Sequence, residues 1–438
     1  MKVAILSDHY LTGGAAQATD RVNLSLFLFC LKLPIGLLEQ VDVYNARITL
    51  FAENEKKRGL TPFRAASKRE VLWYEESPLT RQFYRPVRKL FPHRFPHPNT
   101  AEYAARQLRK ALGRRQPSII SVHNLHAGTP WGWGPHLVEA CLEFAPVVWT
   151  LHDMWSFTGR CAYSYDCDKF ITGCDAACPT PHEAPSLAPE KIRAAWEERR
   201  AIYDRHRHDL VIVAPSRWLA EQAHRGLFAN HRIEVIPYGL TDRYYDFDPF
   251  PREDARRELG INPAGPVLLL AAFDLTERRK GAEIVAHLWR HIEHRPLTVV
   301  TMGRGAIAIN DPLIEVCSLG WIDEDRQKAV AYSAADALLH PALADNFPNV
   351  VLEAFACGTP AIAMPVGGLP EMVRPGVSGW LADAATPDGL GRAVERAIRD
   401  LSLGKSLRES SRDLAAKEYS LELQGRRYFQ LFQELRRR

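Results

Sequence analysis

The 438-residue sequence lacks any apolar run long enough to cross a membrane as a helix. Its longest run, at 24–38, is broken by Lys32 and Pro34 and falls short of the roughly 20 residues that a spanning helix needs. The amino-terminal stretch MKVAILSD has one Lys and then a strand, without the apolar segment and small-residue cleavage site of a signal peptide. We therefore expect a cytoplasmic protein in which residues 24–38 form a buried helix.

The chain also has little excess of either charge, because its net charge is only +4. The excess is local: residues 1–115 hold 20 Lys and Arg against 10 Asp and Glu, and it peaks at 68–97, where basic and aromatic residues interleave. No nucleic-acid-binding motif accompanies this charge, which argues against nucleic acid as a partner. A solvated insertion at about 55–100 is one interpretation. The other is contact with an anionic partner, either a phosphorylated acceptor or the inner face of the cytoplasmic membrane.

Internal repeats and low-complexity tracts are absent as well, and apolar strand-like runs alternate instead with amphipathic stretches. This alternation favours parallel sheets covered by helices on both faces, the doubly wound α/β arrangement. The length and the 46% of apolar residues suffice for two such domains, each with its own core. The nine runs lie at 3–8, 46–52, 118–124, 147–153, 210–216, 267–274, 297–303, 335–341 and 360–366.

A segment rich in Pro, Gly and charge divides this series of runs. We predict an amino-terminal domain at 1–240, a linker at 241–264, a carboxyl-terminal domain at 265–417 and an amphipathic helix with a basic end at 418–438. Two doubly wound domains that face each other leave a crevice lined by the carboxyl ends of their strands. Open α/β sheets bind ligands there.

The stretch DNFPNVVLEAFACGTP at 345–360 predicts a loop and a short helix after a strand. Pro348 suits the first turn of a helix, and Gly358 suits its end. Asn349 and Glu353, four residues apart, share a side of this helix that we expect to face the crevice. A carboxylate there accepts from the two hydroxyls of a ribose, while the helix start attracts a phosphate. The alternative makes Asp345 a helix cap and Glu353 an ordinary surface residue.

Polar residues also follow two strands of the amino-terminal half. His123 and His126 end the run at 118–124, and His152 with Asp153 ends the run at 147–153. They are interpreted either as ligand-binding residues in the crevice or as structural histidines.

Eight cysteines are present, and four of them, Cys161, Cys167, Cys174 and Cys178, lie within 18 residues. In a cytoplasmic protein such a group favours a structural zinc over disulfides. The spacing lacks the usual C-x2-C pair, so free thiols or disulfides stay open as alternatives. The other four, Cys30, Cys141, Cys317 and Cys357, are expected to be buried as small apolar residues.

Residues 345–381 resemble the carboxylate-x7-carboxylate signature of the family-four retaining glycosyltransferases, and the similarity extends through GGLPE and SGWL. LHDMWSFTGRCAYSYDC, at 151–167, resembles a subgroup from bacterial surface-polysaccharide pathways. The resemblance implies a GT-B fold, with two Rossmann-like domains facing across a crevice and the carboxyl-terminal helix crossing back to the first domain. It also implies retaining transfer of a hexose-type sugar from a nucleotide-sugar donor to a hydroxyl of a glycan or lipid-linked acceptor. The amino-terminal domain would bind the acceptor, and catalysis would need no cofactor.

The same resemblance implies the roles of the donor-site residues. Glu353 would bind the ribose, and Asp345, where the family often has Glu, would contact the sugar. Asn346 and Asn349 border them. Lys280, before Gly281, matches the family's diphosphate-binding Lys.

The family's diphosphate-binding Arg has no clear match, because Asp274 or Leu275 falls near its position. We expect Arg279 to replace it, with Arg278 as the alternative, because two phosphates need compensating charge.

In the amino-terminal domain, Gly13 and Gly14 would border the diphosphate, as glycines that let backbone approach closely. The resemblance places His126 at the family's active-site His and His152 on the acceptor side. Either would position a hydroxyl or carry its proton rather than attack the sugar.

Other functions stay open. A nucleotide-sugar epimerase shares the fold, and a glycogen-type phosphorylase would need a pyridoxal-bearing Lys that we cannot place. The missing Arg also suits a non-catalytic nucleotide-binding scaffold.

Overall fold

The structure is a computed structural model that describes residues 2–8, 42–48, 70–71, 101–123, 125, 134–181, 183, 185–240, 250–263 and 265–437. The chain divides into two compact units. The first unit consists of Met1–Pro215, Leu219–Ile236 and Arg426–Arg438, and the second of Ser216–Trp218 and Pro237–Gly425.

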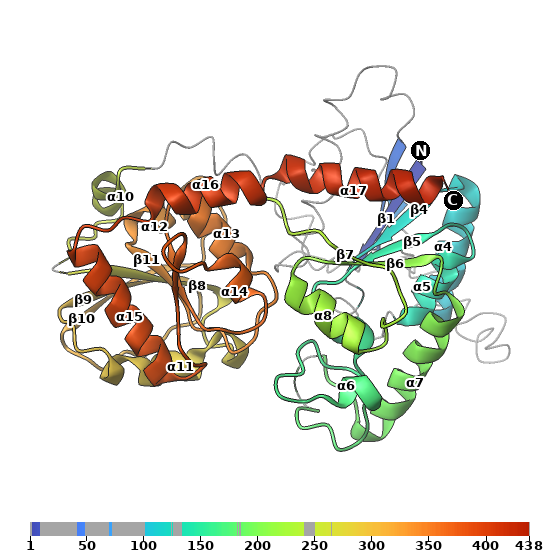
Figure 1. Cartoon of the computed structure of the whole chain (residues 1–438), viewed down its shortest axis with the longest axis horizontal. Coiled ribbons are helices and arrows are strands. Elements are labelled where there is room, and N and C mark those ends of the chain that lie inside the picture. The colour runs from blue at the N-terminus through green and yellow to red at the C-terminus, as the bar shows by residue number, and fades with distance from the viewer. Residues whose placement is uncertain are drawn as a thin grey trace, which may run out of the picture. The chain divides into compact units, whose positions relative to one another are not determined.

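The first unit contains a seven-stranded parallel sheet in the order β3-β2-β1-β4-β5-β6-β7. Figure 1 labels its strands β1, β4, β5, β6 and β7. Its central strands are the apolar runs that the sequence predicts, because a strand covered on both faces has no polar side. The second strand lies earlier than predicted, and two short edge strands were not predicted. The strands are β1 Lys2–Asp8, β2 Asp42–Ile48, β3 Glu70–Val71, β4 Ile119–Val122, β5 Val147–Thr150, β6 Leu210–Ala214 and β7 Ile233–Val235.

The helices of the first unit include most of the carboxyl-terminal helix α17, Leu421–Arg436. Its side chains Tyr428 and Phe432 share an apolar cluster with Val148 of β5 and Val213 of β6. The predicted return of this helix to the amino-terminal domain is therefore confirmed. The others are α4 Ala101–Arg115, α5 Pro135–Leu142, η2 Trp155–Phe157, α6 Lys169–Thr172, α7 Pro189–Arg205 and α8 Arg217–Arg225, whose first two residues belong to the second unit.

The second unit contains a six-stranded parallel sheet in the order β10-β9-β8-β11-β12-β13. The order reverses at β8, so chain connections leave in both directions, as in doubly wound folds. The strands are β8 Val267–Asp274, β9 Leu297–Arg304, β10 Ile314–Gly320, β11 Ala337–His340, β12 Ala361–Ala363 and β13 Gly379–Leu381.

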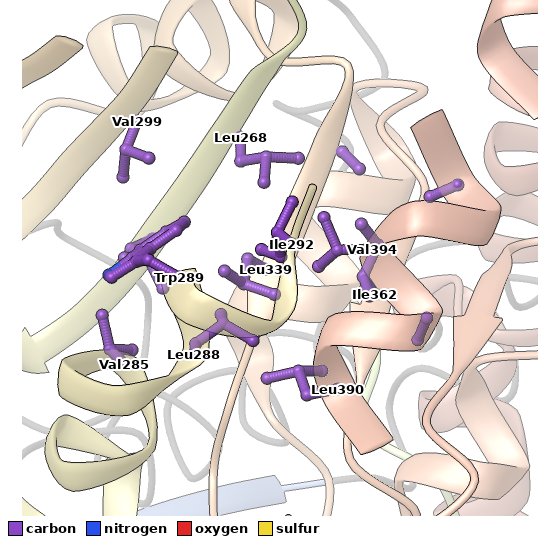
Figure 2. Close-up of a cluster of buried hydrophobic side chains, with 14 of the residues drawn as sticks. Leu268, Val285, Leu288, Trp289, Ile292, Val299, Leu339, Ile362, Leu390 and Val394 are labelled. Atoms are coloured by element: carbon purple, nitrogen blue, oxygen red, sulfur yellow. The ribbon is translucent and has the colours of Figure 1, made fainter. Parts of the chain in front are cut away.

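Helices cover the second sheet and bury its core. Figure 2 shows Leu268 of β8, Leu339 of β11 and Ile362 of β12 beside Leu288 and Val394, which two covering helices contribute. The helices of this unit are α10 Arg252–Glu258, η3 Arg278–Lys280, α11 Ala282–Leu288, η4 Trp289–His291, α12 Asp325–Ala334, α13 Asn349–Ala356, α14 Leu369–Met372, α15 Pro387–Ser402 and α16 Arg408–Glu418.

Part of the predicted linker is helix α10, which belongs to the second unit. Arg256 on this helix forms an ion pair with Asp336 at 2.9 Å, and Ala255 is buried. The expected α/β class with two parallel sheets is confirmed. In the described part of the chain, no helix combines the length and apolarity needed to cross a membrane.

Candidate active site

Three charged residues meet where β11 ends in the second unit. The Nζ atom of Lys280 lies 2.6 Å from Oδ2 of Asp345, in the loop between β11 and α13. Nη1 of Arg279 lies 3.9 Å from the same oxygen and donates to the carbonyl of Ala344 at 3.2 Å. Nε2 of His340, the last residue of β11, lies 3.4 Å from Oδ2 of Asp345. The predicted diphosphate cations and the predicted sugar-binding carboxylate therefore form one cluster.

This cluster has a defined charge state. Burial acts to raise the pKa of Asp345, but the charge of Lys280, the hydrogen bond to His340 and the charge of Arg279 together outweigh it and hold the pKa well below its usual range. Burial lowers the pKa of His340, although Asp345 opposes that shift. At neutral pH the cluster therefore combines an ionised carboxylate with a neutral imidazole and two cations. Asp345 is buried and is not a helix cap, because α13 is preceded by Pro348.

Glycines let the backbone segments of this cluster approach each other. Gly281 has φ +90°, and a Cβ there would lie 2.1 Å from the carbonyl oxygen of Pro341. Gly367, with φ +57°, would place a Cβ 1.7 Å from the carbonyl oxygen of Asp345. Any side chain at either position would displace the loop that carries Asp345. The close packing around this loop therefore explains why Gly281 and Gly367 are glycines.

Glu353 lies on α13 and is not an ordinary surface residue, so that alternative interpretation of the sequence is wrong. The residue is only 6% exposed, and Oε2 accepts a hydrogen bond from the phenol of Tyr332 on α12 at 2.9 Å. The helix is short and apolar, and the other residues from Val351 to Ala356 are buried with it. Sequence reasoning missed Tyr332; the available signal was a Tyr in the apolar second half of α12, because a phenol needs a partner when buried.

The two asparagines of the predicted site differ in their surroundings. Asn346 is buried, and its Oδ1 accepts from the hydroxyl of Ser216 at 2.6 Å. Asn349 is half-buried and is the first residue of α13. Asn346 is therefore bonded to Ser216, and Asn349 has accessible surface at a helix start.

The position expected for the family's Arg carries no positive charge. Oδ1 of Asp274 accepts from the backbone N–H and the hydroxyl of Thr276, at 2.8 and 2.6 Å, and Leu275 is buried. Arg279 is directed to the Asp345 cluster, as described above. Arg278 is exposed, and its Nε lies 3.7 Å from Glu283. Of the two candidates, Arg279 lies in the cluster.

An aromatic group that the sequence did not predict as a unit lies at the carboxyl ends of β8, β9 and β10. Phe273 and Trp321 make an edge-to-face contact with ring centroids 5.1 Å apart. The guanidinium of Arg304 lies 4.7 Å from the Phe273 ring centroid and 5.4 Å from that of Trp321. Both aromatic residues are more than one-third exposed. Such a group can stack on a planar ligand.

The first unit carries a pair of histidines at the ends of β4 and β5. Nδ1 of His123 lies 3.3 Å from Nε2 of His152, and the hydroxyl of Ser121 lies 3.3 Å from Nε2 of His123. His123 is fully buried, and burial followed by the charge of His152 holds its pKa well below the usual value. Asp153 accepts from the backbone N–H of Trp155. His152 is only half-buried, so it is the imidazole that a ligand can reach.

Three predicted site residues, Gly13, Gly14 and His126, lie outside the described residues, and so does Cys30. The other single cysteines are Cys141 and Cys357, which are buried as predicted, and Cys317, which is half-buried.

The four clustered cysteines are free thiols that line one cavity of about 20 Å³. Burial raises the pKa of Cys161 to about 12 and that of Cys174 to about 11. The backbone N–H of Gly159 donates to Sγ of Cys174 at 3.1 Å. Within the described ranges, however, no three His, Cys, Asp or Glu side chains are placed to hold a metal ion. The structural zinc stays a prediction.

Two family models match the chain. The one described as Glycosyl transferases group 1 matches residues 265–400, and the one described as Glycosyltransferase Family 4 matches residues 55–243. The chain is 30% identical over 315 residues to a D-inositol 3-phosphate glycosyltransferase of Corynebacterium jeikeium, across 66% of this chain and 70% of that protein. It is 26% identical over 265 residues to the putative colanic acid biosynthesis glycosyl transferase WcaC of Escherichia coli, across 56% of this chain and 60% of that protein. The match thus spans about three fifths of WcaC.

Solved structures resemble the whole chain. A sucrose-phosphate synthase from Thermosynechococcus elongatus has a TM-score of 0.67 at 19% identity, covering 99% of this chain and 98% of that one. HepE of Anabaena, in complex with UDP-glucose, has a TM-score of 0.62 at 14% identity, covering 99% and 100%. WaaG, a glycosyltransferase involved in lipopolysaccharide biosynthesis, has a TM-score of 0.57 at 15% identity, covering 99% of both chains. At these identities the likeness concerns the fold.

Proposed function

Because the chain belongs to the group 1, or family 4, glycosyltransferases, we propose that it transfers a sugar, with retention, from a nucleoside diphosphate sugar to a hydroxyl of a glycan or lipid-linked acceptor. The observation that carries the proposal is the meeting of Lys280, Arg279 and Asp345 at one strand end. Two cations beside a carboxylate suit a ligand that presents phosphate and sugar hydroxyls together.

The second unit would bind the donor. Lys280 and Arg279 would neutralise the diphosphate as it leaves, which is where negative charge grows in the reaction. The pair of Lys280 with Asp345 at 2.6 Å must then be shared with the ligand. Asp345 would keep one oxygen for a sugar hydroxyl. Asn346 and Asn349 border this site, and Glu353 would bind the ribose.

The first unit would bind the acceptor. His152 is half-buried beside the neutral His123, at 3.3 Å. A neutral imidazole can orient a hydroxyl or accept its proton. His126, Gly13 and Gly14 would act with it. No side chain is assigned as a covalent nucleophile, and the leaving diphosphate would take the acceptor proton.

The pathway is proposed to be exopolysaccharide or lipopolysaccharide synthesis. The similarity to WcaC, a putative colanic acid biosynthesis glycosyl transferase, and to WaaG, which is involved in lipopolysaccharide biosynthesis, supports it. Synthesis on a lipid carrier would bring the protein to the inner face of the cytoplasmic membrane, and the basic residues at 68–97 would contact anionic lipid. Flotation with anionic liposomes at low salt tests this contact, with neutral liposomes as the control. Absence of binding to the anionic liposomes would refute it.

Calorimetric titration with UDP, GDP, ADP and dTDP tests the donor site. We expect one nucleotide to bind, and Glu353→Ala to weaken it by about 2–3 kcal/mol, as for lost hydrogen bonds to a charged group. Glu283→Ala is the matched control, because Glu283 is an exposed carboxylate on α11. If no nucleotide binds, or if Glu353→Ala binds as wild type does, the proposal fails.

A scaffold without activity is the second candidate, favoured by Asp274 at the position where the family has Arg. Donor turnover separates the two functions. A scaffold would bind the nucleotide but would neither transfer nor hydrolyse the matching nucleotide sugar. An epimerase would interconvert donor sugars without an acceptor, and product analysis distinguishes it.

A further inference from the structure

The hydrogen bond between Tyr332 and Glu353 joins two buried groups. Tyr332 is fully buried on α12, and Glu353 is 6% exposed on α13. The phenolic oxygen lies 2.9 Å from Oε2 of Glu353. An ionised carboxylate only accepts, so the phenol is the donor. A buried carboxylate is tolerated when donors compensate it, and this phenol is such a donor.

A second contact holds the same tyrosine by its backbone. The carbonyl oxygen of Tyr332 accepts from the hydroxyl of Thr359 at 2.7 Å. Thr359 follows the turn that ends α13, and its N–H donates to the carbonyl of Ala354 at 2.8 Å. Helix α13 is therefore tied to Tyr332 twice, through Glu353 within the helix and through Thr359 after it. The phenol and the carboxylate therefore belong to one set of hydrogen bonds that joins α12 to α13 and to Thr359.

We propose that Tyr332 is a positioning residue that sets the orientation in which Glu353 receives the ribose hydroxyls of the donor. The inference rests on the proposed role of Glu353 as the ribose ligand. A carboxylate offers about four lone-pair positions, so Glu353 can accept from a ligand hydroxyl as well as from the phenol. The terminal torsion of a Glu side chain is soft, so an anchored oxygen is needed to fix it. Tyr332 thereby makes the site selective for a ribonucleotide over a deoxyribonucleotide.

A purely structural Tyr332 predicts something different. Losing its hydroxyl would then weaken all nucleotides equally, or only lower stability. A positioning role weakens only the contacts that Glu353 makes, because the phosphate cations Lys280 and Arg279 are bound to other partners. The ratio of affinities for a ribonucleotide and its deoxy counterpart therefore separates the two roles.

The experiment measures binding of UDP and 2′-deoxy-UDP, and likewise GDP and ADP with their 2′-deoxy forms, to the full chain by calorimetry. We expect wild type to prefer one ribonucleotide by about tenfold or more, and Tyr332→Phe to reduce that preference by about threefold or more, as for one hydrogen bond to a charged group. Affinity for the 2′-deoxynucleotide should fall less than affinity for the ribonucleotide, because only its 3′-hydroxyl remains to bind Glu353.

Tyr428→Phe is the matched control. Its phenol is equally buried and bonds to the hydroxyl of Thr150 at 2.8 Å, in the first unit. We expect this variant to lose stability and to keep the wild-type preference. Thr359→Val gives a second approach should Tyr332→Phe not fold. Loss of the Thr359 hydroxyl in Thr359→Val should also lower the preference for the ribonucleotide, whereas Thr359→Ser keeps the hydroxyl and should keep that preference.

The outcomes are distinct. A wild-type ratio in Tyr332→Phe, or an equal loss for both nucleotides, overturns the positioning role while the transferase proposal stands. If wild type does not distinguish the ribonucleotide, or if Glu353→Gln binds it as wild type does, Glu353 is not the ribose ligand. That result overturns both this inference and the proposed donor site.

Discussion

The two units carry different chemistry at the carboxyl ends of their strands. In the second unit an ionised Asp345 meets Lys280 and Arg279, so the site is built from compensated charges. In the first unit His123 meets the hydroxyl of Ser121 and the imidazole of His152, so the site is built around a buried neutral imidazole. Charged groups suit an anionic donor, whereas neutral groups suit the hydroxyl of an acceptor. Under the proposed function, the same strand-end geometry would serve two classes of ligand through the side chains placed there.

Among the variants considered, removal of Lys280 should have the largest effect on the charged site of the second unit. Lys280→Ala is expected to lower the transfer rate by about 10²- to 10³-fold, because one stabilising group for the leaving charge is lost. It should also cost about 3 kcal/mol of stability, because Asp345 remains buried without its ammonium partner. Initial rates and denaturant unfolding measure the two effects.

Two variants sharpen that result. Adding Asp345→Asn to Lys280→Ala should recover stability without recovering activity, since it removes the buried carboxylate that has lost its ammonium partner. Arg278→Ala is the control, because Arg278 is an exposed cation of the same short helix η3. An equally large loss of activity in Arg278→Ala would contradict a specific role for Lys280.

The four clustered cysteines of the first unit are predicted to bind a structural zinc. If the predicted zinc is present, metal analysis of the purified chain gives about one zinc per chain, and a chelator lowers the melting temperature of the first unit by several degrees. Cys174→Ser should abolish the bound zinc, whereas Cys317→Ser in the second unit should leave it. Recovery of metal-free protein with four titratable clustered thiols would rule the zinc out.

Acid should act on the first unit's cluster before it acts on the second unit's ion pair. The pKa of His123 is lowered by burial and by His152, so the unfolded chain takes up a proton near pH 6.5 that the folded chain does not. The stability due to neutral His123 is present above that pH and is lost as the pH falls toward the folded pKa. The pKa of Asp345 is also lowered, so its ion pair is lost only below the usual Asp range.

The free energy of unfolding, measured from pH 7.5 to 5, tests whether the contribution of His123 is lost in this range. Wild type should lose roughly 1.4 kcal/mol per pH unit for this proton below pH 6.5. His123→Asn should flatten the dependence. His340→Asn should flatten it less, because the pKa of His340 is lowered by burial but Asp345 opposes the shift. A stability independent of pH in this window would show that His123 accepts its proton within the folded chain.

The smallest expected effect concerns the aromatic group of the second unit. Trp321→Ala should weaken nucleotide binding by about tenfold, if the base stacks on Trp321 and Arg304. Trp289→Phe, at a buried ring of the core, is the control and should change stability rather than affinity. Unchanged affinity in Trp321→Ala would place the base elsewhere.

Much of the fold could be predicted because buried parallel strands are continuous apolar runs. β6 and β8 are examples, with boundaries close to the predicted ones. β10 was missed because it alternates polar and apolar residues at a sheet edge, and Val316 is 42% exposed. β13 was missed because its three residues carry too little pattern.

The candidate site shows the same division. The spacing from Asp345 to Glu353 and the KG pair at 280–281 could be recognised in the sequence, because local motifs place groups at fixed intervals along the chain. The residues that contact Asp345 and Glu353 could not be predicted in this way. Tyr332 lies 21 residues before Glu353, and Lys280 lies 65 before Asp345, so chain distance gave no indication of the contacts.

The sequence by itself therefore determined the α/β class, the strand series and the positions of the two carboxylates, since these follow from periodicity and local spacing. Only the tertiary structure decided that Asp345 is paired with Lys280 and that Glu353 is buried against Tyr332. Burial and pairing depend on segments that the sheet brings together from distant parts of the chain, and on the desolvation that follows. Those are properties of packing, which local patterns do not encode.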